Sequence, residues 1–105
     1  MANDFLIGDT IRLEATIKNY ADAETAPDAA PTVSVYRADG STKLLDGATS
    51  SKVDGTTAEY TYEWQIATSL TASERLIALW EWLASTVPHK KKVHFYVVTL
   101  ADYNR

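Results

Sequence analysis

The sequence predicts an all-β protein, an antiparallel sandwich of about seven strands, and three observations lead to this prediction. From residue 11 to residue 18 apolar and polar side chains alternate strictly, which is the period of a strand that buries one face. An Asp-Gly pair, a strong signal for a tight hairpin turn, occurs at residues 39–40, 46–47 and 54–55. Strand-like runs recur about every ten residues, the spacing typical of a sandwich or barrel.

Other strands are expected on both sides of this first one. A short strand at 5–7 precedes it and ends at the turn pair Gly8-Asp9. Residues 19–31 are small, acidic and proline-bearing, so we expect an exposed loop there and not a second domain. The remaining candidates are short apolar, β-branched or aromatic runs bounded by turn signals, and they lie at 32–36, 43–45, 50–53, 58–64 and 93–100.

The segment 71–84 fits two structures. Thr71 and Glu74 have the spacing of a helix capping box, which favours a helix. Strict alternation favours a strand instead, with one face made of Leu76, Ala78, Trp80, Trp82 and Ala84. We favour the strand, because the segments around it are extended and a turn expected at 87–90 leads into the run 93–100. A helix at 71–84 remains the alternative.

Length and charge narrow the class of protein. The chain has 105 residues, which predicts a single domain over 1–105 with enough buried surface to fold without metal or disulfide. The net charge is −4, whereas a nucleic-acid-binding protein usually carries a basic excess, so no nucleic-acid partner is expected. The imbalance is uneven: residues 1–64 hold 11 acids and 5 bases, and residues 65–105 hold 3 acids and 5 bases.

Several chemistries and locations are excluded by residues that the sequence lacks. There is no cysteine, so disulfides, thiolate metal sites and cysteine nucleophiles are ruled out. The first residues lack the basic and apolar regions of a signal peptide, and no apolar run approaches the roughly 20 residues that span a bilayer. We therefore expect a protein made in the cytoplasm without a signal peptide and with no membrane partner.

Four stretches of the chain carry a resemblance to a known family. Each stretch is made of residues typical of strands and of the turns that join them. The four are Gly8-Asp9-Thr10-Ile11-Arg12-Leu13, Val33-Ser34-Val35-Tyr36-Arg37-Ala38-Asp39-Gly40, Tyr60-Thr61-Tyr62-Glu63-Trp64-Gln65-Ile66 and Leu79-Trp80-Glu81-Trp82. In this order they resemble immunoglobulin-like β-sandwich modules of prokaryotic surface proteins and small stand-alone immunoglobulin-like proteins of tailed viruses and prophages. The resemblance covers roughly residues 5–99 and implies an immunoglobulin-like fold. Such modules usually have a glycine in the last hairpin, whereas residues 85–90 contain none, so a longer or differently shaped tip is expected.

No arrangement of residues predicts catalysis, a cofactor or a metal. Phosphate loops, nucleophile elbows and zinc-helix motifs are all missing from the sequence. His89 and His94 are expected on opposite faces of a strand. The remaining groups considered are acidic: a loop set for calcium (Asp22, Glu24, Asp28) and a strand set for glycoside hydrolysis (Glu59, Glu63, Glu81). The first set matches no known calcium-loop spacing, and nothing in the sequence fixes the separation of the second, so we expect solvated carboxylates, no cofactor and no enzyme.

Two clusters have both a structural and a binding interpretation. Lys90, Lys91 and Lys92 could contact an anionic partner, but lysines at a hairpin tip or a strand edge more often discourage unwanted strand pairing. The second cluster is aromatic and could be a platform for sugars or, as we favour, the filling between two sheets: Tyr60, Tyr62, Trp64, Trp80 and Trp82.

The last two strands are apolar on both faces, although the outer face of a sandwich should be polar. In the segment 71–84, three apolar residues lie on the face opposite Trp80 and Trp82, and in the run 93–100 three more lie on the outer face. These six residues are Ile77, Leu79, Leu83, Tyr96, Val98 and Leu100. An apolar face of this kind marks an interaction surface. We therefore expect a protein partner, in a homo-oligomer or a larger virion assembly.

The expected function is non-enzymatic: a structural or assembly protein, as an accessory component of a phage or prophage virion, that acts through protein–protein contacts. The virion part of this expectation comes from the resemblance. The alternative is an immunoglobulin-like binding module of a cell-surface or carbohydrate-binding protein.

Overall fold

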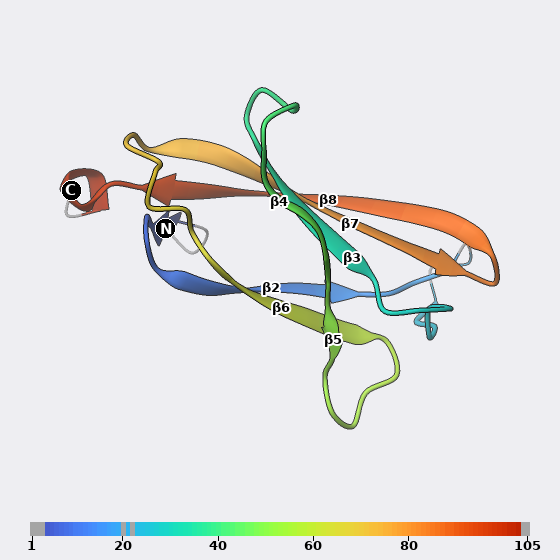
Figure 1. Cartoon of the computed structure of the whole chain (residues 1–105). Coiled ribbons are helices and arrows are strands. Elements are labelled where there is room, and N and C mark those ends of the chain that lie inside the picture. The colour runs from blue at the N-terminus through green and yellow to red at the C-terminus, as the bar shows by residue number, and fades with distance from the viewer. Residues whose placement is uncertain (1–3, 20, 22, 104–105) are drawn as a thin grey trace.

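The computed structural model describes residues 4–19, 21 and 23–103, which fold into two β-sheets packed face to face (Figure 1). One sheet has five strands in the order β1-β8-β7-β3-β4, and the other has three in the order β2-β6-β5. The elements are β1 (Asp4–Leu6), β2 (Thr10–Thr16), β3 (Thr32–Arg37), β4 (Lys43–Thr49), β5 (Ser51–Lys52), β6 (Glu59–Gln65), β7 (Glu74–Ala84), β8 (Val87–Val98) and the short helix α1 (Leu100–Tyr103). The predicted all-β sandwich is confirmed.

The chain changes sheets several times, and this order of strands is compatible with an immunoglobulin-like sandwich. Neighbouring strands are antiparallel except for β1, which runs parallel to β8 with Asp4 opposite Tyr96 and Leu6 opposite Val98. After β1 the chain turns at Gly8, which has a φ of 94°, and crosses to the other sheet as β2. Because β1 and β2 lie in different sheets, no hairpin forces β1 to be antiparallel to its neighbour.

The ambiguous segment is a strand, as favoured from the alternation. β7 spans Glu74–Ala84 and pairs with β3 on one side and β8 on the other. Its inward positions Leu76, Ala78 and Trp80 are at most 1% exposed. A helix could not bury these alternate residues together, because its period is 3.6 and not 2.

The β7–β8 hairpin differs from the expectation for residues 85–90. The turn consists of Ser85 and Thr86 alone, with φ angles of 50° and 66°, and Val87–Lys90 already belong to β8. The predicted turn at 87–90 is therefore wrong, and so is a longer tip, whereas the alternative of a differently shaped tip is confirmed by two non-glycine residues at positive φ. Asp28 provides the physical reason, because its carboxylate accepts hydrogen bonds from the amides of Ser85 (3.1 Å) and Thr86 (2.8 Å). A residue from a distant loop thus holds a left-handed turn that glycine usually occupies.

Two of the three Asp-Gly pairs form the predicted turns, and the third does not. Gly40 and Gly55 lie in turns with positive φ. Gly47 lies inside β4, where the register with β3 shifts between Val33 and Val35, so this pair forms a β-bulge. The Gly47 amide donates to the hydroxyl of Ser34 (2.9 Å), which folds the bulge over the outer face of β3.

The core lies between the two sheets and is apolar. Its fully buried side chains come from both layers and include Ile17, Val33, Val35, Ile66, Leu76, Trp80 and Val97. Trp64 and Phe95 meet edge to face across the layers, with ring centroids 6.4 Å apart. Most of the inward face of the large sheet is therefore used in folding, and its outward face is the first place to look for function.

Candidate interaction surface

The outward face of the five-stranded sheet carries an aliphatic row along β7. Ile77, Leu79 and Leu83 point away from the core, and Glu81 is the one charged residue between them. Ile77 and Leu79 are half-buried, whereas Leu83 is 46% exposed. The outer face of an isolated sandwich is normally polar, so this row is the least expected feature of the fold.

The structure covers the middle of this row with neighbouring side chains. Ile77 is flanked by Tyr36 on β3 and His94 on β8, and Leu79 is flanked by Ser34 and Lys92. Polar side chains with long apolar stems can shield aliphatic neighbours in this way. The row is therefore interrupted by Glu81, half-buried at Ile77 and Leu79, and exposed at Leu83.

The other three predicted interface residues lie toward the opposite end of the sheet. Tyr96 and Val98 are on the outer face of β8, and Tyr96 is 50% exposed. Leu100 is 63% exposed but belongs to α1, so it does not continue the strand. Tyr96 lies eight positions along β8 from Pro88, the cross-strand neighbour of Leu83, which is about 26 Å at strand rise. The six residues thus share one side of the sheet without forming a single exposed patch.

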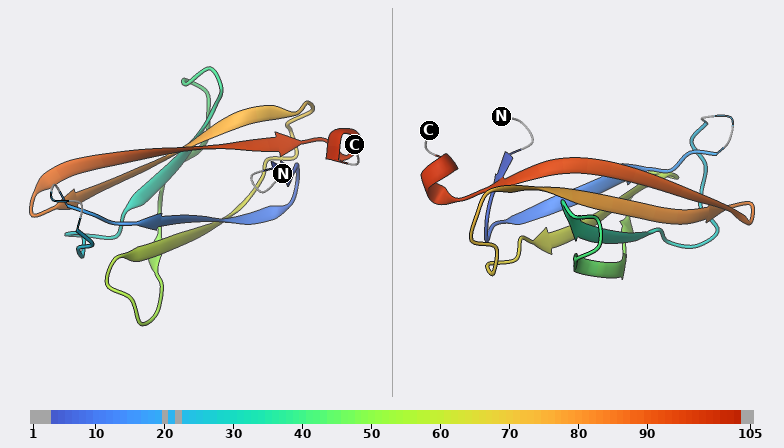
Figure 2. Two further views of the ribbon diagram at one scale, coloured as in Figure 1. Left: turned by 180° about the vertical axis from the view of Figure 1, so that it is seen from behind. Right: turned by 90° about the horizontal axis from the view of Figure 1, so that it is seen from above.

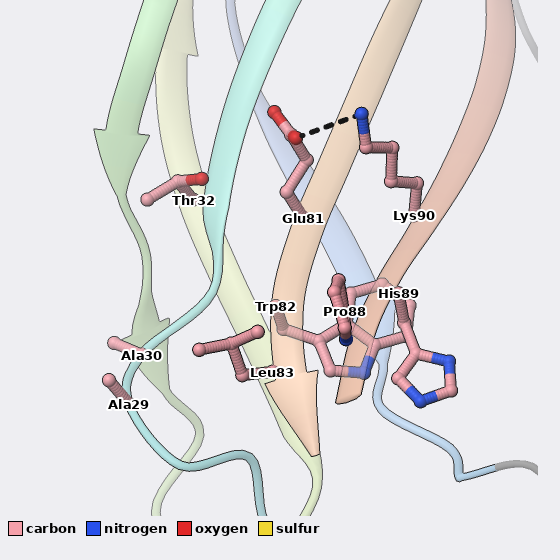
Figure 3. Close-up of a pocket in the computed structure, with 9 residues that line it drawn as sticks. All are labelled: Ala29, Ala30, Thr32, Glu81, Trp82, Leu83, Pro88, His89 and Lys90. Atoms are coloured by element: carbon pink, nitrogen blue, oxygen red, sulfur yellow. Dashed lines mark ion pairs between the residues drawn. The ribbon is translucent and has the colours of Figure 1, made fainter. Parts of the chain in front are cut away.

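A shallow hollow of about 300 Å³ extends the Leu83 end of the row (Figure 3). Ala29 and Ala30, which precede β3, lie on one side of Leu83, and Trp82 lies on the other. Lys90 and Glu81 form an ion pair at the rim, with 3.5 Å between Nζ and Oε2. This volume is at the lower limit for small-molecule sites, so the hollow suits an apolar side chain better than a cofactor.

No pattern in the sequence predicts this hollow. Its far wall, Ala29 and Ala30, is placed by the amide of Asp28, which donates to the carbonyl of Leu83 (2.8 Å). This contact joins residues far apart in the chain, and periodicity cannot reveal it. Trp82 Nε1 is buried beside the hollow and has no hydrogen-bond partner among the described residues, while its ring stacks on His89 at 5.8 Å.

The three lysines lie within β8 and not at the hairpin tip. Lys90 and Lys92 pair with the outward residues Glu81 and Leu79, whereas Lys91 pairs with the inward residue Trp80. Consecutive strand residues point to opposite faces, so the three ammonium groups do not converge on one anion. What they share is the outer edge of β8.

The structure places most of the aromatic cluster in the core. Tyr60 and Trp64 are 8% exposed and Trp80 is 1% exposed, so these rings are not available to a sugar. Tyr62 and Trp82 are half-buried against the core. The core interpretation that the sequence favoured is therefore confirmed for three of the five rings.

The carboxylates and histidines are dispersed. Glu59 and Glu63 lie on the outer face of the three-stranded sheet, and Glu81 lies on the opposite side of the sandwich. His89 pairs with an inward residue and His94 with an outward one, as predicted. Within the described part of the chain no three His, Asp or Glu side chains are close enough together to hold a metal ion.

The two calcium candidates that the structure describes, Glu24 and Asp28, have separate structural roles. Asp28 closes the β7–β8 turn, Glu24 forms an isolated backbone bridge with Lys18, and Asp22 lies outside the described residues. Among the described residues, no helix is long and apolar enough to cross a membrane.

Comparison with known protein families, with curated proteins and with solved structures found no significant match.

Proposed function

We propose that this protein is a non-enzymatic assembly component that acts by protein–protein contact through the outer face of its five-stranded sheet. The observation that carries the proposal is the aliphatic row Ile77, Leu79 and Leu83 on a face where an isolated sandwich is normally polar. The hollow next to Leu83 provides a place where one apolar side chain of a neighbour can be buried.

The assembly that we propose is a self-associating one, as in the accessory immunoglobulin-like proteins of tailed-virus particles that the sequence resembles. The virion part of the proposal rests on that resemblance alone. It predicts that the chain is a stoichiometric component of particles purified from its source. Purified particles that lack the chain would contradict this part and leave the contact surface untouched.

The contact surface is tested by sedimentation velocity over a range of concentrations. We expect the wild type to associate, and Leu83→Lys with Tyr96→Lys to be monomeric, since both residues are exposed and the changes should not disturb the core. Thr16→Lys with Thr61→Lys, on the outer face of the other sheet, is the matched control and should associate like the wild type. A wild type that stays monomeric at all concentrations contradicts self-association.

A further inference from the structure

Among the residues that the structure describes, little covers the outer edge of β8. β7 pairs with β8 along its whole length, from Ala84 opposite Val87 to Glu74 opposite Val97. On the other side, β1 pairs with β8 at residues 96–98, and within the described part of the chain no strand pairs with residues 90–95 there. Figure 2 shows β1 meeting β8 near the end that leads into α1. A free strand edge presents backbone amides and carbonyls to which another strand can pair.

The sandwich is also open beside this edge. A hollow of about 270 Å³ lies between β2 and β8, and it is lined by the exposed Val93 and by core side chains that include Ile11, Leu13, Trp80 and Phe95. Val93 pairs with the inward residue Ala78 and yet is 38% exposed, because nothing in the described chain covers it at this edge. The hollow is too small for a typical ligand and matches the size of an apolar side chain carried by an added strand.

The charges at this edge decide which kind of strand fits. An antiparallel copy of β8 centred on Lys91 would bring Lys90 of one chain opposite Lys92 of the other, and like charges directly opposite each other are destabilising. Acidic residues of a partner strand at the same positions would instead lie opposite the three lysines, on both faces of the sheet. The lysines therefore oppose self-pairing and favour an acidic segment, which is how an interface obtains specificity.

We propose that the free edge of β8 accepts an extended segment of a partner protein by strand addition. The segment is acidic where it borders Lys90, Lys91 and Lys92, and apolar where its side chain enters the hollow beside Val93. This inference concerns the backbone edge of β8, and the proposed function concerns the aliphatic row, although Lys90 and Lys92 border both. Protection of residues 90–95 by a peptide reports the edge alone, so each proposal can fail while the other holds.

Synthetic peptides test the proposal. The probes are Glu-Asp-Glu-Val-Thr-Val and the reverse order, so that either strand direction can pair, and the measurement is amide hydrogen exchange of residues 90–95 with a titration by NMR. We expect one of the two peptides to bind and to slow exchange along this edge. The same peptide with alternate amides N-methylated keeps its charges but loses one hydrogen-bonding edge, and it should not bind.

Charge variants complete the test. Lys90→Glu with Lys92→Glu should weaken peptide binding by about tenfold, because two attractive cross-strand pairs become repulsive. Lys52→Glu on β5, at an edge of the other sheet, makes the same kind of change and should leave binding unaltered. If the Glu variants fold poorly next to Glu81, Lys90→Gln with Lys92→Gln should give a smaller loss. Failure of both acidic peptides to protect residues 90–95, or equal binding of the N-methylated peptide, overturns the proposal.

Discussion

Asp28 holds the β7–β8 turn, and Asp28→Ala is the change whose effect can be worked out most directly. The variant loses both hydrogen bonds from the amides of Ser85 and Thr86, two residues at positive φ. The Asp28 amide that contacts Leu83 remains, so the loop keeps one attachment. The substitution therefore removes the side-chain hydrogen bonds to the turn and keeps the backbone hydrogen bond between Asp28 and Leu83.

The expected cost follows from comparable interactions. Loss of a capping side chain at a helix N-terminus costs about 0.5–2 kcal/mol, and hydrogen bonds to charged groups contribute about 1.5–3 kcal/mol each. Because this turn is exposed to water, we expect a combined loss of about 1–2 kcal/mol. For a domain of this size, that corresponds to a fall in Tm of about 5–10 °C.

Urea unfolding followed by tryptophan fluorescence, together with a thermal scan, measures this loss. Glu24→Ala is the matched control, since it removes an exposed acid of the same loop and should change stability by less than about 0.5 kcal/mol. Equal midpoints for wild type and Asp28→Ala, with equal slopes, would refute the assignment of Asp28 as the residue that holds the turn.

Three further predictions concern the turn, an acid and the core. Ser85→Gly with Thr86→Gly should raise the free energy of unfolding by about 0.5–1 kcal/mol, because glycine adopts positive φ without strain; a lower free energy of unfolding contradicts this. Hydrogen bonds from the amide and hydroxyl of Thr42 lower the pKa of Asp39 to about 2, so its contribution to stability is complete above about pH 4 and is lost as the pH falls through 2. A carboxyl-carbon titration should show this midpoint, and Thr42→Val should raise it. Trp80→Ala should cost about 3–5 kcal/mol in urea unfolding, and a loss below 1 kcal/mol contradicts its place in the core.

The local alternation of apolar and polar residues was sufficient to predict a strand and its inner face where one face of the sheet is buried. Strict alternation predicted β7 as a strand and assigned Leu76 and Trp80 to its inner face, because a period of two has only one way to bury half of a strand. The same alternation placed Ile77 and Leu79 outside, as observed. It could not show that cross-strand neighbours cover them, since that depends on which strands pair.

Features that need distant partners were missed. The turn at Ser85 lacks glycine because Asp28, 57 residues earlier, stabilises it, and no local signal carries that information. The Asp46-Gly47 pair has the sequence of a hairpin turn, but β3 continues alongside it, so the extra residue becomes a bulge. The hollow beside Leu83 also depends on the loop that contains Asp28, because Ala29 and Ala30 of that loop form one of its walls.

Methyl NMR spectra recorded over a range of protein concentrations test the central claim most directly, when sedimentation is measured on the same samples. If the outer face of the five-stranded sheet is the contact surface, the methyl signals of Leu79 and Leu83 shift as the mass rises, while those of the core residue Leu13 stay fixed. A rise in mass with the Leu79 and Leu83 signals unchanged would place the contact elsewhere. The absence of any rise in mass would contradict self-association itself.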